Sequence, residues 1–256
     1  MKGVVLAAGE GSRLRPLTDQ RPKALCPVGN RALLELALER VRTVAPSVAV
    51  NVHAHREQME QHLSACAPSV HVSVEHGERL GTAGALGRLR DWIAGDAVVV
   101  TNVDALTTPD LTELVDGWDG ERIRLLVAFG ADEPDFDGIW KYAGACLMPW
   151  SAVRDLPDRP ADLYTERWRP AADAGRLDLL PTRQGFIDCG TPLRYLVANL
   201  VVSGGQAVIA DDAVVEGTVE ASVVWPGAHV AAGEHLRHAI RLTDRQTVYP
   251  LARDDS

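Results

Sequence analysis

The sequence predicts an α/β fold in which a mostly parallel sheet is covered by helices on both faces. Short β-branched apolar runs alternate with segments of helical periodicity over the first two-thirds of the chain. Such alternation is typical of parallel strands that are joined by crossover helices. After Gly204 the periodicity changes. The sequence therefore also predicts a second, smaller structure at the C-terminal end.

The first strand is expected at residues 3–8, where GVVLAA is short and rich in valine, as in strands buried on both faces. Further strands are expected at residues 47–52, 69–75, 96–104, 122–129 and 141–150. Helices are expected at residues 32–44, 56–66, 82–93 and 110–118. A proline-rich connection follows at residues 155–164. Residues 185–202 indicate a strand, a turn and a helix that Thr191 caps, with Pro192 in its first turn.

The C-terminal segment carries a period of six residues. Val224, Val230, Leu236 and Leu242 recur at this spacing, with small and polar residues between them. A hexapeptide period predicts a parallel β-helix, here of about two coils; a set of short antiparallel hairpins is the alternative. We therefore expect a large domain, of the size of a typical enzyme domain, at residues 1–203. A β-helix-like segment is expected at residues 204–243 and a tail at residues 244–256.

Composition limits the classes of function. The chain has 256 residues and a formal net charge of −9, which argues against a general nucleic-acid-binding protein. The four cysteines form no CxxC pair, as expected for reduced thiols. The apolar run at the N-terminus is too short for a signal peptide, and no segment approaches the ~20 apolar residues of a membrane span. We therefore expect a cytoplasmic protein that binds no membrane.

Residues 9–25, GEGSRLRPLTDQRPKAL, follow the first strand and combine two glycines with four basic side chains. Glycine-rich loops in this position usually hold phosphates, because bare backbone N–H groups approach an anion closely. The P-loop pattern is absent. The dinucleotide pattern fails because its third glycine is Leu14 and because Pro16 interrupts the helix that should follow. This weighs against an oxidoreductase and favours a nucleoside triphosphate as the ligand.

The loop resembles the signature of the sugar-1-phosphate nucleotidyltransferases, or NDP-sugar pyrophosphorylases. Their pattern is G-x-G-[ST]-R-[LM]-x-P-L-T followed by P-K, and Ser12 stands here at the [ST] position. Similar segments are LGTAGAL at residues 80–86, VVVTNVDAL at 98–106 and FIDCGTPLRYLVAN at 186–199. The resemblance implies a Rossmann-like, GT-A-like domain with a mixed, mostly parallel sheet, followed by a left-handed parallel β-helix stub.

Two features depart from the family pattern. Val103 replaces the glycine of the N-G-D strand end, and the lysine motif E-K-P is missing between Phe129 and Lys141. The compact form most resembles the mannose-1-phosphate guanylyltransferase-like and N-acetylmuramate-1-phosphate uridylyltransferase-like branches. The sequence leaves the choice between GTP and UTP open.

The resemblance implies the reaction of an NTP with a sugar 1-phosphate, or a related phosphorylated acceptor, to give an NDP-sugar and pyrophosphate. The implied nucleotide-binding residues are Leu6, Ala7, Ala8, Gly9, Gly11, Ser12, Arg13, Lys23, Glu75, Gly81 and Thr82. The implied catalytic residues are Arg13, Lys23 and Asp104. Asp104 and Asp188 would bind Mg²⁺, and Asn102, Tyr142 and Gly144 would contact the sugar.

Two points remain open in this interpretation. A catalytically silent paralogue that binds an NDP-sugar and regulates a partner is the alternative, although it has no reason to keep all of Arg13, Lys23, Asp104 and Asp188. The β-helix stub is a common oligomerisation surface in such families, so a homo-oligomer is a further hypothesis.

Overall fold

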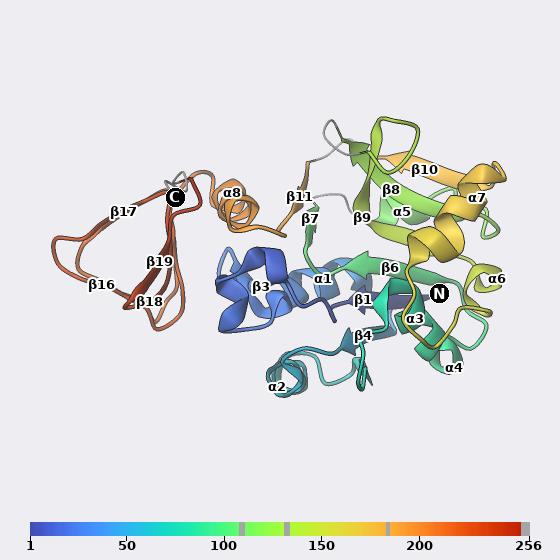
Figure 1. Cartoon of the computed structure of the whole chain (residues 1–256), viewed down its shortest axis with the longest axis horizontal. Helices are drawn as coiled ribbons and strands as arrows, with labels where there is room; N and C mark the ends of the chain where they lie inside the picture. Colours follow the sequence, from blue (N-terminus) through green and yellow to red (C-terminus); the bar gives the residue numbers. More distant parts are fainter. Residues whose placement is uncertain (108–110, 131–133, 183–184, 252–256) are drawn as a thin grey trace. The chain divides into compact units, whose positions relative to one another are not determined.

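The computed structural model describes residues 1–107, 111–130, 134–182 and 185–251 (Figure 1). The expected helix at 110–118 begins, and the expected tail at 244–256 ends, outside the described residues. Packing divides the chain into two compact units. Unit 1 comprises Met1–Glu10 and Leu34–Phe186, and unit 2 comprises Gly11–Leu33 and Ile187–Ser256. Each unit is described by itself.

Unit 1 is built on a seven-stranded sheet (Figure 1). In sheet order its strands are β10 (Leu177–Pro181), β8 (Ile123–Phe129), β9 (Trp140–Met148), β6 (Val98–Asn102), β1 (Lys2–Leu6), β4 (Val48–Val52) and β5 (His71–Val74). Neighbouring strands are parallel except β9, which runs antiparallel to both β6 and β8. This confirms the expected mixed, mostly parallel sheet. The carboxyl ends of β1, β4 and β6 meet at one edge, because Leu6 is in register with both Asn51 and Asn102.

The other elements of this part of the chain follow the predicted alternation. They are α1 (Leu33–Arg42), α2 (Arg56–Cys66), α3 (Gly81–Arg88), α4 (Arg90–Ile93), β7 (Ala105–Thr107), α5 (Leu111–Val115), α6 (Trp150–Val153), the π-helical turn η4 (Tyr164–Trp168) and α7 (Arg169–Asp173). The helix expected at 82–93 is two helices, because Leu89 leaves the helical conformation. The sequence did not predict β10. Its residues LDLLP are all at least partly exposed and include a charge and a proline, so they give no strand pattern.

One hydrophobic core cluster of unit 1 brings strands of the sheet together with α3. Buried aliphatic side chains of the strands pack against Leu86 and Leu89; they include Val4, Val98, Val100 and Leu125. Burial of such side chains is the main stabilising contribution in a fold of this kind.

Glycines on α3 allow a backbone segment to pack directly on the helix. A Cβ atom at Gly84 would lie 2.2 Å from the carbonyl oxygen of Arg159, and one at Gly87 would lie 2.1 Å from that of Pro157. Gly81 has a φ of +70°, and its Cβ would lie 2.5 Å from the carbonyl oxygen of Ala161. The glycine-rich segment at 80–86 therefore has a packing role inside unit 1.

Unit 2 combines the loop after β1 with the C-terminal part of the chain. Its elements are three 3₁₀ turns, η1 (Ser12–Leu14), η2 (Leu17–Asp19) and η3 (Lys23–Leu25), the strands β2 (Pro27–Val28) and β3 (Arg31–Ala32), most of β11 (Phe186–Asp188), and α8 (Pro192–Val202). The Thr191 side chain accepts a hydrogen bond from the backbone N–H of Arg194, which confirms the expected N-cap.

The C-terminal strands are β12 (Val208–Ile209), β13 (Val214–Val215), β14 (Thr218–Glu220), β15 (Val223–Val224), β16 (His229–Val230), β17 (His235–Arg237), β18 (Ile240–Thr243) and β19 (Gln246–Val248). Strands β12, β13 and β14 pair in parallel with β15, β16 and β17, and β15 pairs in parallel with β18. The parallel pairing confirms the β-helix over the hairpin alternative. Among the described C-terminal strands, only β19 turns back, antiparallel to β18. All four side chains of the six-residue series, Val224 to Leu242, are buried.

None of the helices in the described part of the chain is long and apolar enough to cross a membrane.

Candidate active site

A buried polar network joins three strand ends of unit 1. The Asn51 side chain at the end of β4 accepts a hydrogen bond from the Ala7 N–H at 2.7 Å and donates one to Glu75 Oε1 at 2.7 Å. The other carboxylate oxygen, Glu75 Oε2, accepts from the Leu80 N–H at 2.8 Å. Buried polar groups of this kind are stable only when they are paired. The network therefore holds the backbone after β1 and the start of α3 in place.

Asn51 is a residue that sequence reasoning missed. It is an asparagine in an otherwise apolar strand, with the burial pattern of a core position. A polar residue in a strand buried on both faces is a signal that could have identified it.

The end of β6 lies beside a partly buried arginine. Arg40 of α1 donates to the Ala105 carbonyl oxygen at 2.7 Å and to Thr101 Oγ1 at 2.6 Å. Burial lowers the pKa of Arg40 to about 10, while Tyr142 and Asp104 act in the opposite direction. Arg40 lies on the helix that the sequence predicted, but nothing in its spacing distinguished it from a surface arginine.

The expected sugar-side residues have roles in the packing of unit 1. The Tyr142 ring lies 4.6 Å from the Trp168 ring, and burial raises the pKa of its hydroxyl well above the usual value. Gly144 has a φ of +80°, and a Cβ there would lie 2.3 Å from the Ala105 Cβ. Asn102 ends β6, next to Leu6 of β1.

Lys141, in the region where the family motif is missing, pairs with Asp135 at 3.5 Å. The contact ties the start of β9 to the segment before it.

The residues of unit 1 that are expected to line the base pocket are buried or half-buried. Ala7 and Ala8 are buried behind the end of β1. The Thr82 hydroxyl accepts a hydrogen bond from the Leu163 N–H at 2.8 Å. Thr82 therefore helps to hold the segment that packs against α3.

The two glycines of the loop at residues 9–25, Gly9 and Gly11, differ in their surroundings. Gly11 has a φ of +65°, and its Cβ would lie 2.8 Å from Thr18 Cγ2 and 3.1 Å from Lys23 Cβ. The Thr18 hydroxyl donates to the Gly11 carbonyl oxygen at 2.9 Å. Around Gly9, by contrast, a Cβ would meet no described atom within 4 Å. The chain's own packing explains Gly11 but leaves Gly9 unexplained.

Three basic side chains of unit 2 surround one carboxylate. The Asp188 oxygens lie 3.7 Å from Arg13 Nη2, 3.8 Å from Lys23 Nζ and 3.7 Å from Arg194 Nη1. Ser12 and Arg13 belong to η1, Lys23 to η3, Asp188 to β11 and Arg194 to α8. The excess of positive charge in this cluster is chemically suited to an anion such as a phosphate.

One oxygen of the Asp188 carboxylate also has unused hydrogen-bonding capacity. Its Oδ1 atom is buried and makes no hydrogen bond within the described residues. A Cβ at Gly190 would lie 2.8 Å from this oxygen and 3.0 Å from Oδ2, so only glycine leaves room beside it. A buried carboxylate oxygen without a hydrogen bond fits the ligand preference of a hard divalent cation.

Side chains of α8 and the β-helix hold the loop after β1 through hydrogen bonds and a cation–π contact. The Tyr195 hydroxyl donates to the Pro27 carbonyl oxygen and accepts from Trp225 Nε1 at 2.9 Å. The Gly29 N–H donates to Asn199 Oδ1 at 3.1 Å, and the Arg21 guanidinium lies 4.3 Å from the centre of the Trp225 ring. Sequence reasoning matched the motif that contains Tyr195 and Asn199 but did not assign these contacts.

The structure thus groups the expected residues in two sets. Gly11, Ser12, Arg13, Lys23 and Asp188 lie together in unit 2; Leu6, Ala7, Ala8, Gly9, Glu75, Gly81, Thr82, Asn102, Asp104, Tyr142 and Gly144 belong to unit 1. A surface pocket of about 350 Å³ in unit 1, lined among others by Arg122, Ser151 and Arg167, includes none of them.

Known proteins resemble this chain in sequence and in fold. The profile of the Nucleotidyl transferase family matches residues 2–134. An N-acetylmuramate alpha-1-phosphate uridylyltransferase from Caulobacter vibrioides is 36% identical over 229 residues, which cover 77% of this chain and 94% of that protein. A protein of the same name from Neisseria meningitidis is 36% identical over 116 residues, covering 44% of this chain and 50% of that protein. The inositol-1-phosphate CTP transferase from T. maritima has a similar fold, with a TM-score of 0.64, 17% identity, and coverage of 78% of this chain and 94% of that one.

Proposed function

Because this chain belongs to the nucleotidyl transferase family, we propose that it joins UTP to N-acetylmuramate α-1-phosphate, releasing pyrophosphate. It is a sugar-1-phosphate nucleotidyltransferase; the base and the sugar are the proposal. The observation that carries them is the 36% identity to the Caulobacter uridylyltransferase, which extends over 94% of that protein. The second uridylyltransferase, from Neisseria, supports the same choice over GTP and mannose 1-phosphate.

The proposed reaction is an in-line displacement at phosphorus. A phosphate oxygen of the sugar 1-phosphate attacks the α-phosphorus of UTP. The bond from the α-phosphorus to the bridging oxygen breaks, and pyrophosphate leaves with the electron pair. The protein contributes by positioning the two substrates and by stabilising negative charge.

The basic cluster of unit 2 supplies that charge stabilisation in the proposed mechanism. Arg13, whose side chain is 71% exposed, is free to swing towards the β- and γ-phosphates, where its planar fork suits two oxygens. Lys23, with a side chain only 9% exposed, is a fixed point charge for the α-phosphate and the attacking phosphate. Backbone N–H groups from Gly9 to Ser12 close around the triphosphate.

We propose Asp104 and Asp188 as the ligands of Mg²⁺. The buried, unbonded Oδ1 of Asp188 supports this assignment, as does the position of Asp104 directly after β6. When bound, Mg²⁺ supplies Lewis-acid polarisation of phosphate oxygens. Gly190 keeps the space beside the Asp188 carboxylate open for such a ligand.

The remaining residues shape the base and sugar sides. Leu6, Ala7, Ala8, Gly81 and Thr82 are proposed to line the base pocket. Glu75 uses its two oxygens to hold Asn51 and the Leu80 N–H, so we assign it to the nucleotide site as a positioning residue. Asn102, Tyr142 and Gly144 are proposed for the sugar side.

The test is pyrophosphate release in Mg²⁺, with UTP, GTP, dTTP, CTP and ATP each combined with a panel of sugar 1-phosphates. N-acetylmuramate 1-phosphate and N-acetylglucosamine 1-phosphate form a matched pair, because they differ only in the lactyl group that carries a carboxylate. We expect the highest kcat/KM for UTP with the muramate substrate. Preference for another pair contradicts the proposed specificity. Binding of UTP or NDP-sugar without turnover of any pair points to the silent paralogue.

Variants separate catalysis from folding in the same assay. Lys23→Ala and Asp104→Ala are each expected to lower kcat by about 10²–10³, the usual cost of a lost charge-stabilising group. Arg245→Ala is the matched control, because Arg245 is exposed and outside the cluster. Near-normal turnover of Asp104→Ala in Mg²⁺ would remove this residue from the metal assignment.

A further inference from the structure

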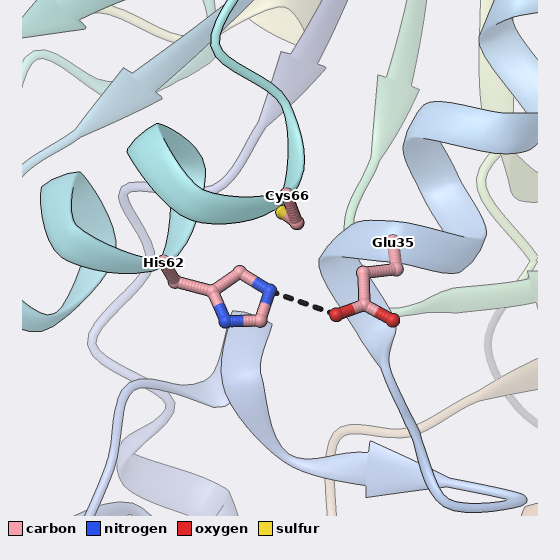
Figure 2. Close-up of side chains that lie close together, drawn as sticks. All are labelled: Glu35, His62 and Cys66. Atoms are coloured by element: carbon pink, nitrogen blue, oxygen red, sulfur yellow. Dashed lines mark ion pairs between the residues drawn. The ribbon is translucent and has the colours of Figure 1, made fainter.

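A group of three metal-ligating side chains lies away from the expected active-site residues. Glu35 belongs to the first turn of α1, and His62 and Cys66 belong to the last turns of α2. One potential ligand atom from each residue lies within 4.8 Å of the other two. Figure 2 shows the His62 ring and the Glu35 carboxylate facing each other, with the Cys66 sulfur nearby.

The spacing of the two α2 residues places both on one face of the helix. His62 and Cys66 are four residues apart, which brings their side chains close together about one turn apart. Glu35 approaches them from the neighbouring helix, so the three ligands come from two rigid elements.

The imidazole nitrogen nearest the carboxylate is buried but not hydrogen-bonded. His62 Nε2 lies 3.0 Å from Glu35 Oε1, yet within the described residues it makes no hydrogen bond. In the tautomer that is protonated on Nδ1, this nitrogen offers its lone pair to a ligand. Such a buried nitrogen is suited to metal coordination.

The local electrostatics favour a cation. The C-terminal turn of α2 carries no basic residue of its own, so the partial negative charge of the helix end is not compensated there. A divalent cation bound between the carboxylate and the sulfur displaces the thiol proton and compensates the charge of both ligands.

We infer that Glu35, His62 and Cys66 bind a Zn²⁺-like divalent transition metal that links α1 to α2. Nitrogen, sulfur and carboxylate ligands together suit zinc and exclude Mg²⁺ as the preferred ion. Tetrahedral zinc needs bonds of about 2.0–2.3 Å and ligand atoms about 3.5 Å apart. The ligand atoms lie at most 4.8 Å apart, so the side chains need to close by no more than about 1.3 Å, which the exposed Cys66 permits. A water molecule would complete the fourth position.

The competing explanation is a plain ion pair between His62 and Glu35 with Cys66 nearby by chance. A zinc-binding measurement distinguishes the metal site from the ion pair, because only the metal site requires the Cys66 sulfur. The test uses the full-length, tag-free chain after treatment with a chelator. Zn²⁺ affinity is measured by competition with a chromogenic chelator, and Co²⁺ is used as a spectroscopic substitute.

We expect one tightly bound Zn²⁺ per chain and a thiolate-to-cobalt charge-transfer band with Co²⁺. Glu35→Gln, His62→Gln and Cys66→Ser should each weaken zinc binding by at least about tenfold, the smallest loss seen even for outer partners of a metal site. The cobalt band should vanish in Cys66→Ser. Matched controls are Glu57→Gln on α2 and His76→Gln, because both residues are exposed and lie outside the group. These two variants should bind zinc as the unmodified chain does.

A second measurement avoids the variants altogether. Cys66 is the exposed cysteine, whereas Cys26, Cys146 and Cys189 are buried. Stoichiometric Zn²⁺ should slow alkylation of Cys66, followed by mass spectrometry, and Mg²⁺ in excess should not. Equal zinc affinity in the unmodified chain and Cys66→Ser, or an alkylation rate that zinc leaves unchanged, overturns the inference. Neither readout depends on nucleotidyltransferase activity, so the outcome is independent of the proposed reaction.

Discussion

Gly9 and Gly11 stand two residues apart in the loop at residues 9–25, but the structure gives them different reasons to be glycine. Gly11 is required by its positive φ and by the closeness of Thr18 and Lys23. Gly9 has open space around it and no unusual φ. In the proposed reaction that space belongs to the triphosphate, which would contact the backbone directly.

This difference predicts opposite phenotypes for two alanine substitutions. Gly9→Ala should leave the thermal midpoint nearly unchanged, within ~0.5 kcal/mol in stability. It should raise KM for UTP by about tenfold or more, equivalent to ~1.4 kcal/mol of binding. Gly11→Ala should lose about 1–3 kcal/mol of stability, because of strain at positive φ and overlap with Thr18. The measurements are denaturant unfolding and steady-state kinetics on both variants; equal effects of the two on KM and on stability contradict the argument.

At the scale of the element, α3 shows a sequence motif with more than one role. Its glycine-rich segment matched the second glycine loop of the family, yet Gly84 and Gly87 face the backbone of residues 157–161. The absence of side chains at these glycines lets the backbone of the proline-rich connection at residues 155–164 pack directly against α3. Each of Ala83 and Gly84 donates its N–H to the Ala161 carbonyl oxygen, which fixes that connection further.

Gly84→Ala tests the close packing on α3, because packing and helix propensity predict changes of opposite sign in the free energy of unfolding. In an open helical position the change would stabilise the protein by ~1 kcal/mol, since alanine favours the helix. Here the added Cβ would lie 2.2 Å from the Arg159 carbonyl oxygen, and we expect a loss of about 1–3 kcal/mol. Urea unfolding measures it, with Ser64→Ala on the exposed face of α2 as the control. A stabilised Gly84→Ala variant would show that the connection does not pack on α3 in solution.

At the scale of the whole molecule, residues far apart in sequence form one structural unit. The loop at Gly11–Leu33 packs with α8 and the C-terminal strands, through Tyr195, Asn199 and Trp225. The β-helix stub therefore supports the loop at Gly11–Leu33, in addition to any role in oligomerisation.

Trp225→Ala tests this coupling between the C-terminal strands and the loop. Loss of the ring removes the hydrogen bond to the Tyr195 hydroxyl and the contact with Arg21. Truncation of a buried tryptophan costs about 3–5 kcal/mol. We expect faster hydrogen exchange at the amides of residues 11–33 and a lower kcat. Val214→Ala, at an exposed position in the neighbouring coil of the β-helix, is the control. Unchanged exchange in the loop of Trp225→Ala would mean that the loop is held by other contacts.

The sequence alone determined the elements whose physical cause is local. The apolar runs of the parallel strands, the periodicity of α1 and α2, the Thr191 cap and the six-residue series from Val224 to Leu242 all appear in the structure. Each rests on the spacing of side chains along one segment, which a single sequence displays. The loop motif likewise sufficed to predict the family.

Only the tertiary structure decided which residues meet. Asn51 and Glu75, Arg40 and Asp104, and Arg13, Lys23 and Arg194 around Asp188 come from separate segments. Strand β10 and the break at Leu89 also escaped prediction, because partial exposure and packing at those positions leave no periodic pattern. The distinction between Gly9 and Gly11, and the convergence of Glu35, His62 and Cys66, depend on through-space distances. Such distances follow from chain packing, which local spacing in the sequence does not encode.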